Sequence, residues 1–432
     1  MIYYPKAVGS VKEDTKSIQD AIDLASRHGG GTVYLSAGEQ YLCGSLVLRP
    51  FITLHLENGS RLMASPNLAD YRKGDEPDDE HTRGVGTPVL RKPAFSFLYA
   101  YDADSVTIDG EGTIDGNCHQ FVSRVNPYHC TSSLYPRPTL VYLEKCNNLR
   151  IKGVTLTNSP FWSLHTAGCD NVLVEGITIR NPLDVANSDG IDPDHCTNVR
   201  IHACHITCAD DCICLKNTKG SAMYPPTKGV VISDCTLVST SSALKIGTEG
   251  VDDFSDILVH NCVVEASNRG ISIQVRDKGS VQNVHFSHIL INTRLFSPDY
   301  WGKAEAIALT SFNRDEQTVS GTIRQIYFDH IVTKGESGIL IAGDGDKIHD
   351  VHFDTVYIGL EKTSKWPLAG YDYRPRFMQD DEHTKPVSAI SVQGKCNLFL
   401  DRVSATIQQH AGFGPLLDAP DATVYGEVTD AT

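Results

Sequence analysis

The segments Asn148-Leu149-Arg150-Ile151, Asn171-Val172-Leu173-Val174 and Asn198-Val199-Arg200-Ile201 repeat one phrase, in which a turn-forming residue precedes an alternating apolar strand. The phrase recurs as Gly229-Val230-Val231-Ile232, Asp256-Ile257-Leu258-Val259, Asn283-Val284-His285-Phe286, Gln325-Ile326-Tyr327-Phe328 and Asp350-Val351-His352-Phe353. The fourth residues of these eight segments are 23, 27, 31, 27, 27, 42 and 25 residues apart. One coil of three short strands needs about this length. The repeat therefore predicts an all-β parallel solenoid that forms a single domain over residues 1–432.

Two other architectures fit the spacing less well. A β-propeller blade repeats at about 40–45 residues, which is longer than most intervals here. A βαβ barrel needs helices between the strands, and the strands of this chain have no helical pattern between them. Asn at the turn agrees with a solenoid, because Asn tolerates left-handed backbone.

Three segments stand outside the repeat. Thr15–Arg27 has the apolar spacing of a helix, and Gly29-Gly30-Gly31 follows as a stop, so we expect an N-terminal cap over about residues 10–30. Such a helix covers the open strand edge of a solenoid. Residues 66–97 are rich in charge and Pro and predict a long loop, and the 42-residue interval predicts an insertion over about 293–323.

Composition excludes several classes of protein. The 38 Lys and Arg against 53 Asp and Glu give a net charge of −15, which argues against a nucleic-acid binder. No apolar run reaches the roughly 18 residues of a membrane span. The N-terminus lacks the basic and apolar regions of a signal peptide, so a cytoplasmic chain is expected, or a secreted one if a leader was trimmed. The 13 Cys residues favour buried free thiols in a reducing compartment.

Apolar pairs align one strand of each coil. The pairs after Ile191 are Ile213/Leu215, Leu244/Ile246, Ile271/Ile273, Ile307/Leu309 and Ile339/Ile341. Strand side chains alternate between faces, so these pairs point inward. The residues two positions before each pair form a column: Asp189, Asp211, Ser242, Arg269, Glu305 and Ser337.

Three carboxylates meet at the start of this column. Asp189 and Asp211 are expected on neighbouring coils about 4.8 Å apart. Asp210 has the opposite parity to Asp211, so both reach one cleft only if the chain turns just before the strand, and we predict that turn. Crowded carboxylates raise the pKa of at least one of them, as acid–base catalysis requires. The structural alternative is that stacked Asp residues cap turns, but the charge cost of three together favours function.

These residues carry a family resemblance. Asn187-Ser188-Asp189-Gly190-Ile191-Asp192, followed by Asp210-Asp211-Cys212, resembles the signature of glycoside hydrolase family 28, the polygalacturonase family. Gly29 to Leu35, Gly44-Ser45-Leu46 and Asn158 to Trp162 are similar too, and the resemblance covers roughly residues 10–360. It implies a right-handed parallel β-helix that hydrolyses galacturonides with inversion and without a cofactor. It implies Asp210 as the general acid, Asp189 and Asp211 as the pair that activates water, and Asn187 as a residue lining the catalytic subsite.

The general chemistry is compatible with this role. An inverting glycosidase separates its acid and base by about 6.5–9.5 Å to admit a water molecule. We expect outward carboxylates on neighbouring coils to lie at spacings of that order.

Two departures from the family pattern bear on specificity. The family's Gly-His-Gly is replaced by Ser241-Ser242-Ala243, and its Arg-Ile-Lys has Ser272 and Gln274 at the basic positions. Rhamnogalacturonan hydrolases of the family also lack the His motif, so smooth polygalacturonate is not the expected substrate. The cations that could bind an acidic sugar instead are Lys216, Lys245, Arg269 and Arg276. For each, the alternative is a solvated turn residue.

Other candidates are less specific. His165 lies on the coil before Asp189 and is either a substrate contact or a structural histidine. Trp301 lies in the insertion, where an aromatic face either stacks on a sugar ring or anchors the loop. A metal site is not expected from a set whose side chains alternation scatters: His195, His202, Cys204, His205, Cys208, Cys212 and Cys214.

The sequence thus predicts an inverting glycoside hydrolase, exo-acting on galacturonic-acid-containing oligosaccharides. Exo action is expected because the 66–97 loop and the insertion near Trp301 are placed to close one end of a groove. The expected partner is an oligosaccharide, with neither nucleic acid nor membrane, and the oligomeric state stays open. Two alternatives remain: a pectin lyase, which needs calcium or an Arg base, and a non-catalytic carbohydrate-binding solenoid.

Overall fold

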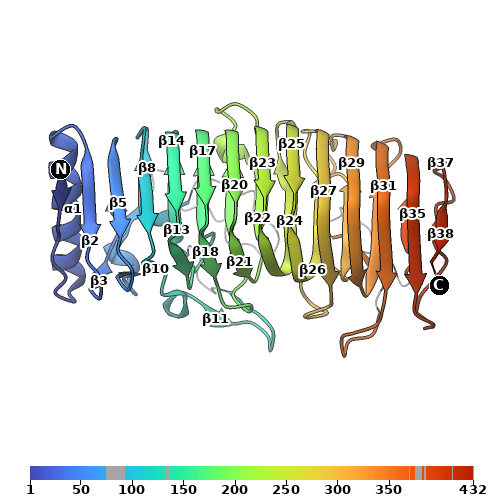
Figure 1. Cartoon of the computed structure of the whole chain (residues 1–432), viewed down its shortest axis with the longest axis horizontal. Coiled ribbons are helices and arrows are strands. Elements are labelled where there is room, and N and C mark those ends of the chain that lie inside the picture. Colours follow the sequence, from blue (N-terminus) through green and yellow to red (C-terminus); the bar gives the residue numbers. More distant parts are fainter. Residues whose placement is uncertain are drawn as a thin grey trace. The chain divides into compact units, whose positions relative to one another are not determined.

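A computed structural model describes residues 1–73, 93–131, 137–368, 370–374, 382–383, 386–410 and 412–431. Its Cα positions form two compact units: unit 1 contains residues 1–210 and 218–225, and unit 2 contains residues 211–217 and 226–432. Figure 1 labels the elements of both. Each unit is a parallel β-helix of short strands, as the repeat predicted. A single domain over residues 1–432 stays a prediction.

Unit 1 stacks its strands in three parallel ladders. The first ladder is β2 (Gly31–Leu35), β5 (Ile52–Leu56), β9 (Thr107–Gly110), β14 (Asn147–Lys152), β17 (Asp170–Glu175) and β20 (Thr197–His202). The second is β3 (Gln40–Cys43), β6 (Arg61–Ala64), β10 (Thr113–Asp115), β15 (Thr155–Thr157), β18 (Thr178–Arg180) and β21 (His205–Cys208). The third is β4 (Leu46–Val47), β8 (Phe95–Tyr101), β13 (Thr139–Glu144), β16 (Leu164–Ala167) and β19 (Ile191–Asp194).

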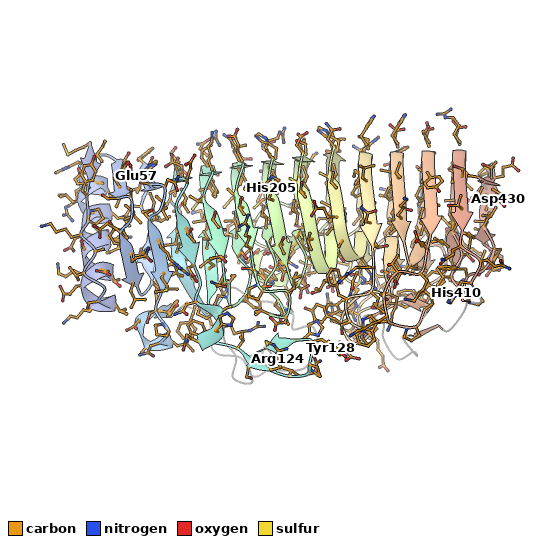
Figure 2. All side chains as sticks on the ribbon, turned by 60° about the horizontal axis from the view of Figure 1, so that its bottom comes forward. Glu57, Arg124, Tyr128, His205, His410 and Asp430 are labelled. Atoms are coloured by element: carbon orange, nitrogen blue, oxygen red, sulfur yellow. The ribbon has the colours of Figure 1, made fainter. Side chains whose placement is uncertain are left out.

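Short elements complete unit 1: β1 (Ile2–Tyr3), the 3₁₀ turns Leu68–Asp70, Cys118–Gln120 and Lys219–Ser221, and β7 (Arg72–Lys73). A hairpin of β11 (Ser123–Arg124) and β12 (Cys130–Thr131) extends from its coils, where Figure 2 labels Arg124 and Tyr128.

Unit 2 continues the pattern with longer strands that bend from one ladder into the next. One ladder is β22 (Ile213–Asn217), β24 (Thr236–Gly250), β26 (Val263–Val275), β28 (Glu305–Ser311), β30 (Ser337–Gly343), β34 (Ile390–Gln393) and β36 (Leu417–Asp418). Another is β23 (Lys228–Ser233), β25 (Phe254–His260), β27 (Val281–Thr293), β29 (Ile323–Gly335), β31 (Ile348–Leu360), β35 (Asn397–Ile407) and β37 (Thr423–Tyr425). The third joins the first half of β24 and β26 to the second half of β27, β29, β31 and β35, and then to β38 (Val428–Asp430). β32 (Tyr371–Asp372) pairs with β33 (Glu382–His383) outside these ladders.

The first residue of each repeated phrase forms a left-handed turn. In all eight copies it has a positive φ, between 54° and 68°. Asn, Asp and Gly adopt this left-handed conformation at the least cost, which accounts for their recurrence at the turn. The Asn side chains also bond between coils, since Asn171 Nδ2 donates to Asn148 Oδ1 at 2.7 Å. The turn chemistry that marks the repeat in the sequence therefore helps to hold neighbouring coils together.

The helix α1 begins four residues earlier than the apolar pattern predicted, at Val11 rather than Thr15, and ends at Arg27 as expected. Its first turn carries Glu13 and Asp14 and no strong apolar signal, so periodicity alone missed it. Asp14 is fully buried and accepts hydrogen bonds from the backbone N–H of Val8, Gly9 and Leu42. The bond to Leu42 joins α1 to β3. In Figure 1, α1 lies beside the first strands of unit 1.

The two segments expected as loops contain regular elements where they are described. Within 66–97, the 3₁₀ turn Leu68–Asp70 and β7 come first and β8 starts at Phe95, while residues 74–92 lie outside the described part of the chain. Within 293–323, β28 forms a regular strand, so the insertion is two loops, 294–304 and 312–322. No helix in the described residues is long and apolar enough to span a bilayer.

Candidate active site

The predicted column of side chains is present in unit 2. Ser242 pairs with Arg269, Arg269 with Glu305, and Glu305 with Ser337 on successive strands. Their apolar partners align in the same register, from Ile213 with Leu244 to Ile307 with Ile339. Asp211 lies on the same path, because Cys212 N donates to Ser242 O at 3.0 Å. The sequence pattern therefore placed this part of the column correctly.

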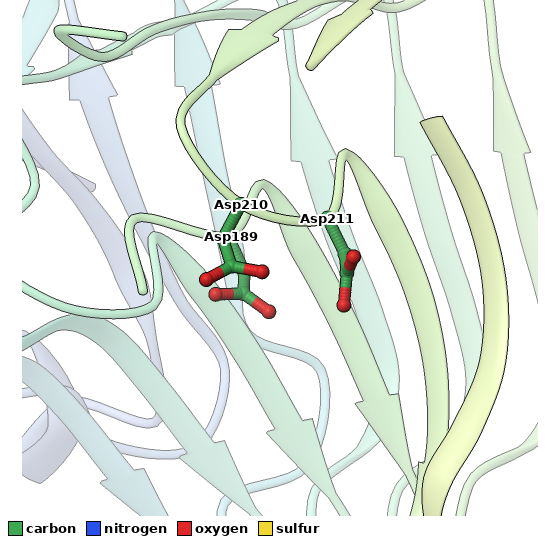
Figure 3. Close-up of side chains that lie close together, drawn as sticks. All are labelled: Asp189, Asp210 and Asp211. Atoms are coloured by element: carbon green, nitrogen blue, oxygen red, sulfur yellow. The ribbon is translucent and has the colours of Figure 1, made fainter. Parts of the chain in front are cut away.

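Asp189 and Asp210, here called the acid pair, both belong to unit 1 and are buried. A carboxylate oxygen of one lies within 4.8 Å of an oxygen of the other (Figure 3). The chain bends at Ala209 and Asp210 after β21, which is the predicted turn. Asp211 follows through one peptide bond, so its Cα lies about 3.8 Å from that of Asp210. The separation of about 6.5–9.5 Å that we expected between the acid and the base stays a prediction.

Asn187 holds Asp210 within unit 1. Asp210 Oδ2 accepts hydrogen bonds from Asn187 N at 3.1 Å and from Asn187 Nδ2 at 3.4 Å. Asn187 has a φ of 58°, a left-handed conformation that Asn adopts more readily than most residues. Asn187, at the turn before Asp189, therefore supplies one backbone and one side-chain donor.

Arg137 is a buried residue that sequence reasoning missed. It is 3% exposed, and its guanidinium reaches Pro160 O at 2.9 Å, Ala186 O at 2.5 Å and Asn187 Oδ1 at 2.8 Å. The same group lies 5.2 Å from the centre of the Phe161 ring. No local motif surrounds Arg137 in the sequence, and its hydrogen-bond partners lie 23 to 50 residues away, so the sequence pattern did not reveal these contacts.

Asp211, in unit 2, has a strongly ionic environment. Lys245 Nζ lies 2.7 Å from Asp211 Oδ2, while Ser241 Oγ and Ser242 N donate to Oδ1 at 2.9 and 3.2 Å. Burial alone would raise the pKa of Asp211, but Lys245 and Lys216, with the hydrogen bonds of Lys245 and Ser241, outweigh it and hold that pKa below its usual value. Asp211 is therefore ionised at neutral pH.

Lys245, predicted as a substrate-binding cation, thus forms an ion pair with Asp211 in this structure. Near Ser242, where the family pattern has a His, Ser241 and Lys245 supply hydrogen-bond donors to Asp211. Direct contact of Lys245 with substrate stays a prediction.

Two further predicted cations of unit 2, Lys216 and Arg276, lie in a buried charge cluster with Arg314, Glu249 and Asp277. Lys216 Nζ is 3.5 Å from Glu249, and Arg314 binds Asp277 through Nε at 2.5 Å and Nη2 at 2.9 Å. Burial and the neighbouring Arg314 lower the pKa of Arg276 to about 10, despite Asp277, Glu249 and Asp315. Arg276 therefore stays charged at neutral pH, but the surrounding carboxylates do not fully compensate its burial.

His165 is buried in unit 1 between the rings of Tyr142 and Trp162, whose centroids lie 4.9 and 4.8 Å away. Its Nε2 is 3.4 Å from Asp194 Oδ2. Asp194 is fully buried, and although burial opposes its ionisation, His165 and His195 hold its pKa well below the usual range. Asp194 also accepts from Thr218 and Ser221, so it fixes both His165 and residues 218–221.

Arg269 lies in a second buried network, here called the loop clamp, with Glu305, Asp372 and Arg374. Its Nε is 3.3 Å from Glu305 and its Nη2 is 3.2 Å from Asp372. Arg269 is 1% exposed, so its visible role is to hold the loops rather than to present a charge to solvent. A substrate contact by Arg269 stays a prediction.

The loop clamp positions Trp301. Asp372 Oδ2 accepts from Gly302 N at 2.7 Å, and Asn268 Nδ2 donates to Trp301 O at 3.0 Å. Arg374 donates to Tyr300 O at 2.7 Å, and its guanidinium lies 5.5 Å from the centre of the Trp301 ring. Gln274, at a family basic position, donates to Arg374 O at 3.3 Å. Sequence reasoning missed residues 371–374 because they lie about 70 residues after Trp301.

The cysteine and histidine set has other hydrogen-bond partners in the described part of the chain, and the absence of a metal stays a prediction. Cys204, Cys208, Cys212 and Cys214 each donate to a backbone carbonyl, as protonated thiols do, and His195 contacts Asp194. All 13 Cys residues lie in the described part of the chain, and all are buried free thiols.

Comparison with known proteins identifies similar sequences. Residues 92–297 match the family model "Glycosyl hydrolases family 28". A "Probable polygalacturonase" of Vitis vinifera is 33% identical over 290 residues, which cover 65% of this chain and 58% of that protein. An "Exopolygalacturonase" of Zea mays is 25% identical over 299 residues, covering 66% of this chain and 64% of that protein. The chain thus spans less than two thirds of these relatives.

Solved structures share the fold. An exopolygalacturonase from Thermotoga maritima has a TM-score of 0.67 at 18% identity, covering 92% of this chain and 93% of that chain. A polygalacturonase from Erwinia carotovora has a TM-score of 0.63 at 19% identity, covering 98% and 96%. At these identities the likeness shows a parallel β-helix fold and nothing about substrate.

Proposed function

We propose that this chain, which belongs to glycosyl hydrolases family 28, hydrolyses galacturonic-acid-containing oligosaccharides from a chain end. The observation that carries the proposal is the contrast between Asp211, held ionised by Lys245, and the adjacent acid pair. Neighbouring carboxylates in different environments are the pattern by which an active site keeps one acid protonated and another ionised.

The proposed reaction assigns one role to each carboxylate. Asp210 gives its proton to the glycosidic oxygen as the bond to the anomeric carbon breaks. Asp211, with Asp189, takes a proton from water as the water oxygen attacks that carbon. The products are two saturated sugars, and the transferred protons leave Asp210 ionised and the water-activating pair protonated until solvent restores both.

The charge cluster around Arg276 supports an acidic substrate. A sugar carboxylate near Arg276 would supply negative charge where burial and Arg314 oppose the cation. Charge-assisted hydrogen bonds between a carboxylate and Lys or Arg are among the strong polar contacts in proteins. Lys216, in contact with Glu249, is the second proposed contact.

Exo action is supported by the loop clamp. The loops 294–304 and 361–374 are joined through buried charges rather than surface contacts, which suits a fixed wall better than an open groove. Exopolygalacturonases are among the relatives and the solved structures, although an endo-polygalacturonase is present as well.

Stereochemistry is a separate part of the proposal. The family resemblance implies hydrolysis with inversion. We propose inversion, because three carboxylates allow two of them to act on water while the third protonates the leaving group. Proton NMR of the first-formed product gives its anomer, and retention of configuration would overturn this part.

A product screen tests the function. Wild type and Asp210→Asn are incubated with digalacturonate, oligogalacturonates and rhamnogalacturonan fragments, and products are separated by chromatography. Release of a saturated monosaccharide by wild type alone is the expected result. Absorbance from an unsaturated product would instead indicate a lyase. Binding without turnover of any substrate would indicate a non-catalytic carbohydrate-binding protein.

A further inference from the structure

Arg137 contacts the active-site turn of unit 1 without reaching the carboxylates directly. Its guanidinium joins three backbone or side-chain oxygens on two segments: Pro160 O, Ala186 O and Asn187 Oδ1. These two segments precede β16 and Asp189, respectively. One buried side chain therefore connects the turn that carries Asn187 to the neighbouring coil.

The contact with Asn187 settles which way its amide faces. A guanidinium has only donors, so the atom of Asn187 that faces Arg137 must be the carbonyl oxygen Oδ1. The amino group Nδ2 then faces Asp210 Oδ2, together with the backbone N–H of the same residue. Without Arg137, the Asn187 amide would lose the partner that selects this orientation.

The orientation also distinguishes the two oxygens of Asp210. Oδ2 accepts two N–H donors, and a carboxylic O–H at that atom would place its proton against them. The proton of the acid form therefore belongs on Oδ1. A general acid must carry its proton on the oxygen that faces the leaving group, so the choice of oxygen affects the rate.

We propose that Arg137 is a positioning residue for Asp210: it fixes the Asn187 amide, which keeps Asp210 Oδ2 an acceptor and leaves Oδ1 to carry the transferable proton. This inference rests on the proposed function, in which Asp210 is the general acid. The charged and titratable groups near Asp210 include Asp189, the adjacent Asp211 with its partner Lys245, and Arg137 through Asn187. The Cys208 thiol also donates to the backbone oxygen of Asp210 at 3.0 Å.

The test compares Arg137→Met and Arg137→Lys with wild type. In Arg137→Met, Asp210 loses an oriented donor and a nearby cation, so its ionised form is less stable and its pKa rises. We expect kcat to fall about 10- to 100-fold with KM within about twofold, and the basic limb of the kcat profile to move to higher pH. Arg137→Lys keeps a donor and a charge and should recover part of kcat.

Arg61→Met is the matched control in unit 1, because it removes a half-exposed arginine that pairs with Asp115. It should leave kcat and the pH profile unchanged. A merely structural role for Arg137 would lower the melting temperature of Arg137→Met but leave its basic limb in place at a temperature where the variant is folded. That result would overturn the inference.

A second measurement separates this inference from the proposed function. If wild type hydrolyses no galacturonide, the function fails, and ¹³C NMR titration of Asp-labelled protein still tests the positioning role. The carboxyl signal that disappears in Asp210→Asn identifies Asp210. Its apparent pKa should be higher in Arg137→Met than in wild type, and an unchanged value would overturn the role of Arg137 independently of activity.

Discussion

Asp210 and Asp211 are consecutive residues, but their carboxylates have different hydrogen-bond partners. Within unit 1, Asp210 Oδ2 receives two N–H groups of Asn187, whose amide Arg137 contacts. In unit 2, Asp211 receives the ammonium of Lys245, a hydroxyl and a backbone N–H. Consecutive carboxylates can therefore have different hydrogen-bond partners, which is the contrast that the following predictions test.

Removing the acid should have the largest effect. Asp210→Asn keeps the hydrogen-bonding shape of the side chain but has no transferable carboxylic proton. We expect kcat on a natural oligosaccharide to fall by about 10²- to 10⁴-fold, with circular dichroism unchanged. Steady-state kinetics measure the loss, and near-wild-type turnover would remove Asp210 from the mechanism.

The loop clamp in unit 2 should matter most for stability. Arg269→Met leaves Glu305 and Asp372 buried without their shared partner, and breaking a buried ion pair costs about 3–5 kcal/mol. Urea unfolding followed through the fluorescence of Trp301 and Trp366 measures the change. The exposed Arg324→Met is the control and should alter the free energy of unfolding by less than about 0.5 kcal/mol. Equal effects of the two variants would contradict a structural role for the loop clamp.

Lys245→Met should change the pH dependence rather than the fold. The pKa of Asp211 lies below its usual value because of Lys245 and Lys216, so removing Lys245 raises that pKa. Asp211 then becomes protonated at a higher pH as the solution is acidified, and the acid limb of kcat/KM moves upward. Turnover below the new limb should fall about tenfold per pH unit.

The exposed Lys228, which pairs with Asp256 in the same unit, provides the control for that experiment. Lys228→Met should leave both limbs in place. An acid limb that stays fixed in Lys245→Met would mean that the ion pair does not set the ionisation of Asp211.

The smallest effect is expected at Trp301. If its ring stacks on a sugar, Trp301→Ala should raise KM about two- to tenfold with little change in kcat, as one aromatic contact contributes about 0.5–1.5 kcal/mol. Tyr425→Ala removes an exposed ring elsewhere in unit 2 and should leave KM unchanged. A fall in kcat alone would indicate that Trp301 shapes the loops rather than binds a sugar.

The fold was predictable because its information is local and repeated. The eight turn residues need positive φ, and their Asn, Asp and Gly preference, together with alternation of apolar residues, reveals the coil length in the sequence. The start of α1 was missed because its first turn is held by buried Asp14, whose partners at Val8, Gly9 and Leu42 leave no periodic signal.

The site was predictable where the chain itself brings residues together. Asp210 and Asp211 are neighbours in the sequence, and the ladder register placed Ser242, Arg269 and Glu305 in one column. Arg137 and Asp372 were not found, since they reach the site from distant loops. The ion pair of Lys245 with Asp211 was not predicted, because alternation indicates which face a side chain takes but not which carboxylate it meets there.

The most direct test of the contrast between the two carboxylates uses a galacturonide with a nitrophenolate leaving group, which departs without protonation. Turnover of this substrate is compared for wild type, Asp210→Asn and Asp211→Asn. If Asp210 is the acid and Asp211 belongs to the base, Asp210→Asn should recover most of the wild-type rate, whereas Asp211→Asn should stay inactive. Recovery by Asp211→Asn alone, or equal loss in both variants, would contradict the assignment.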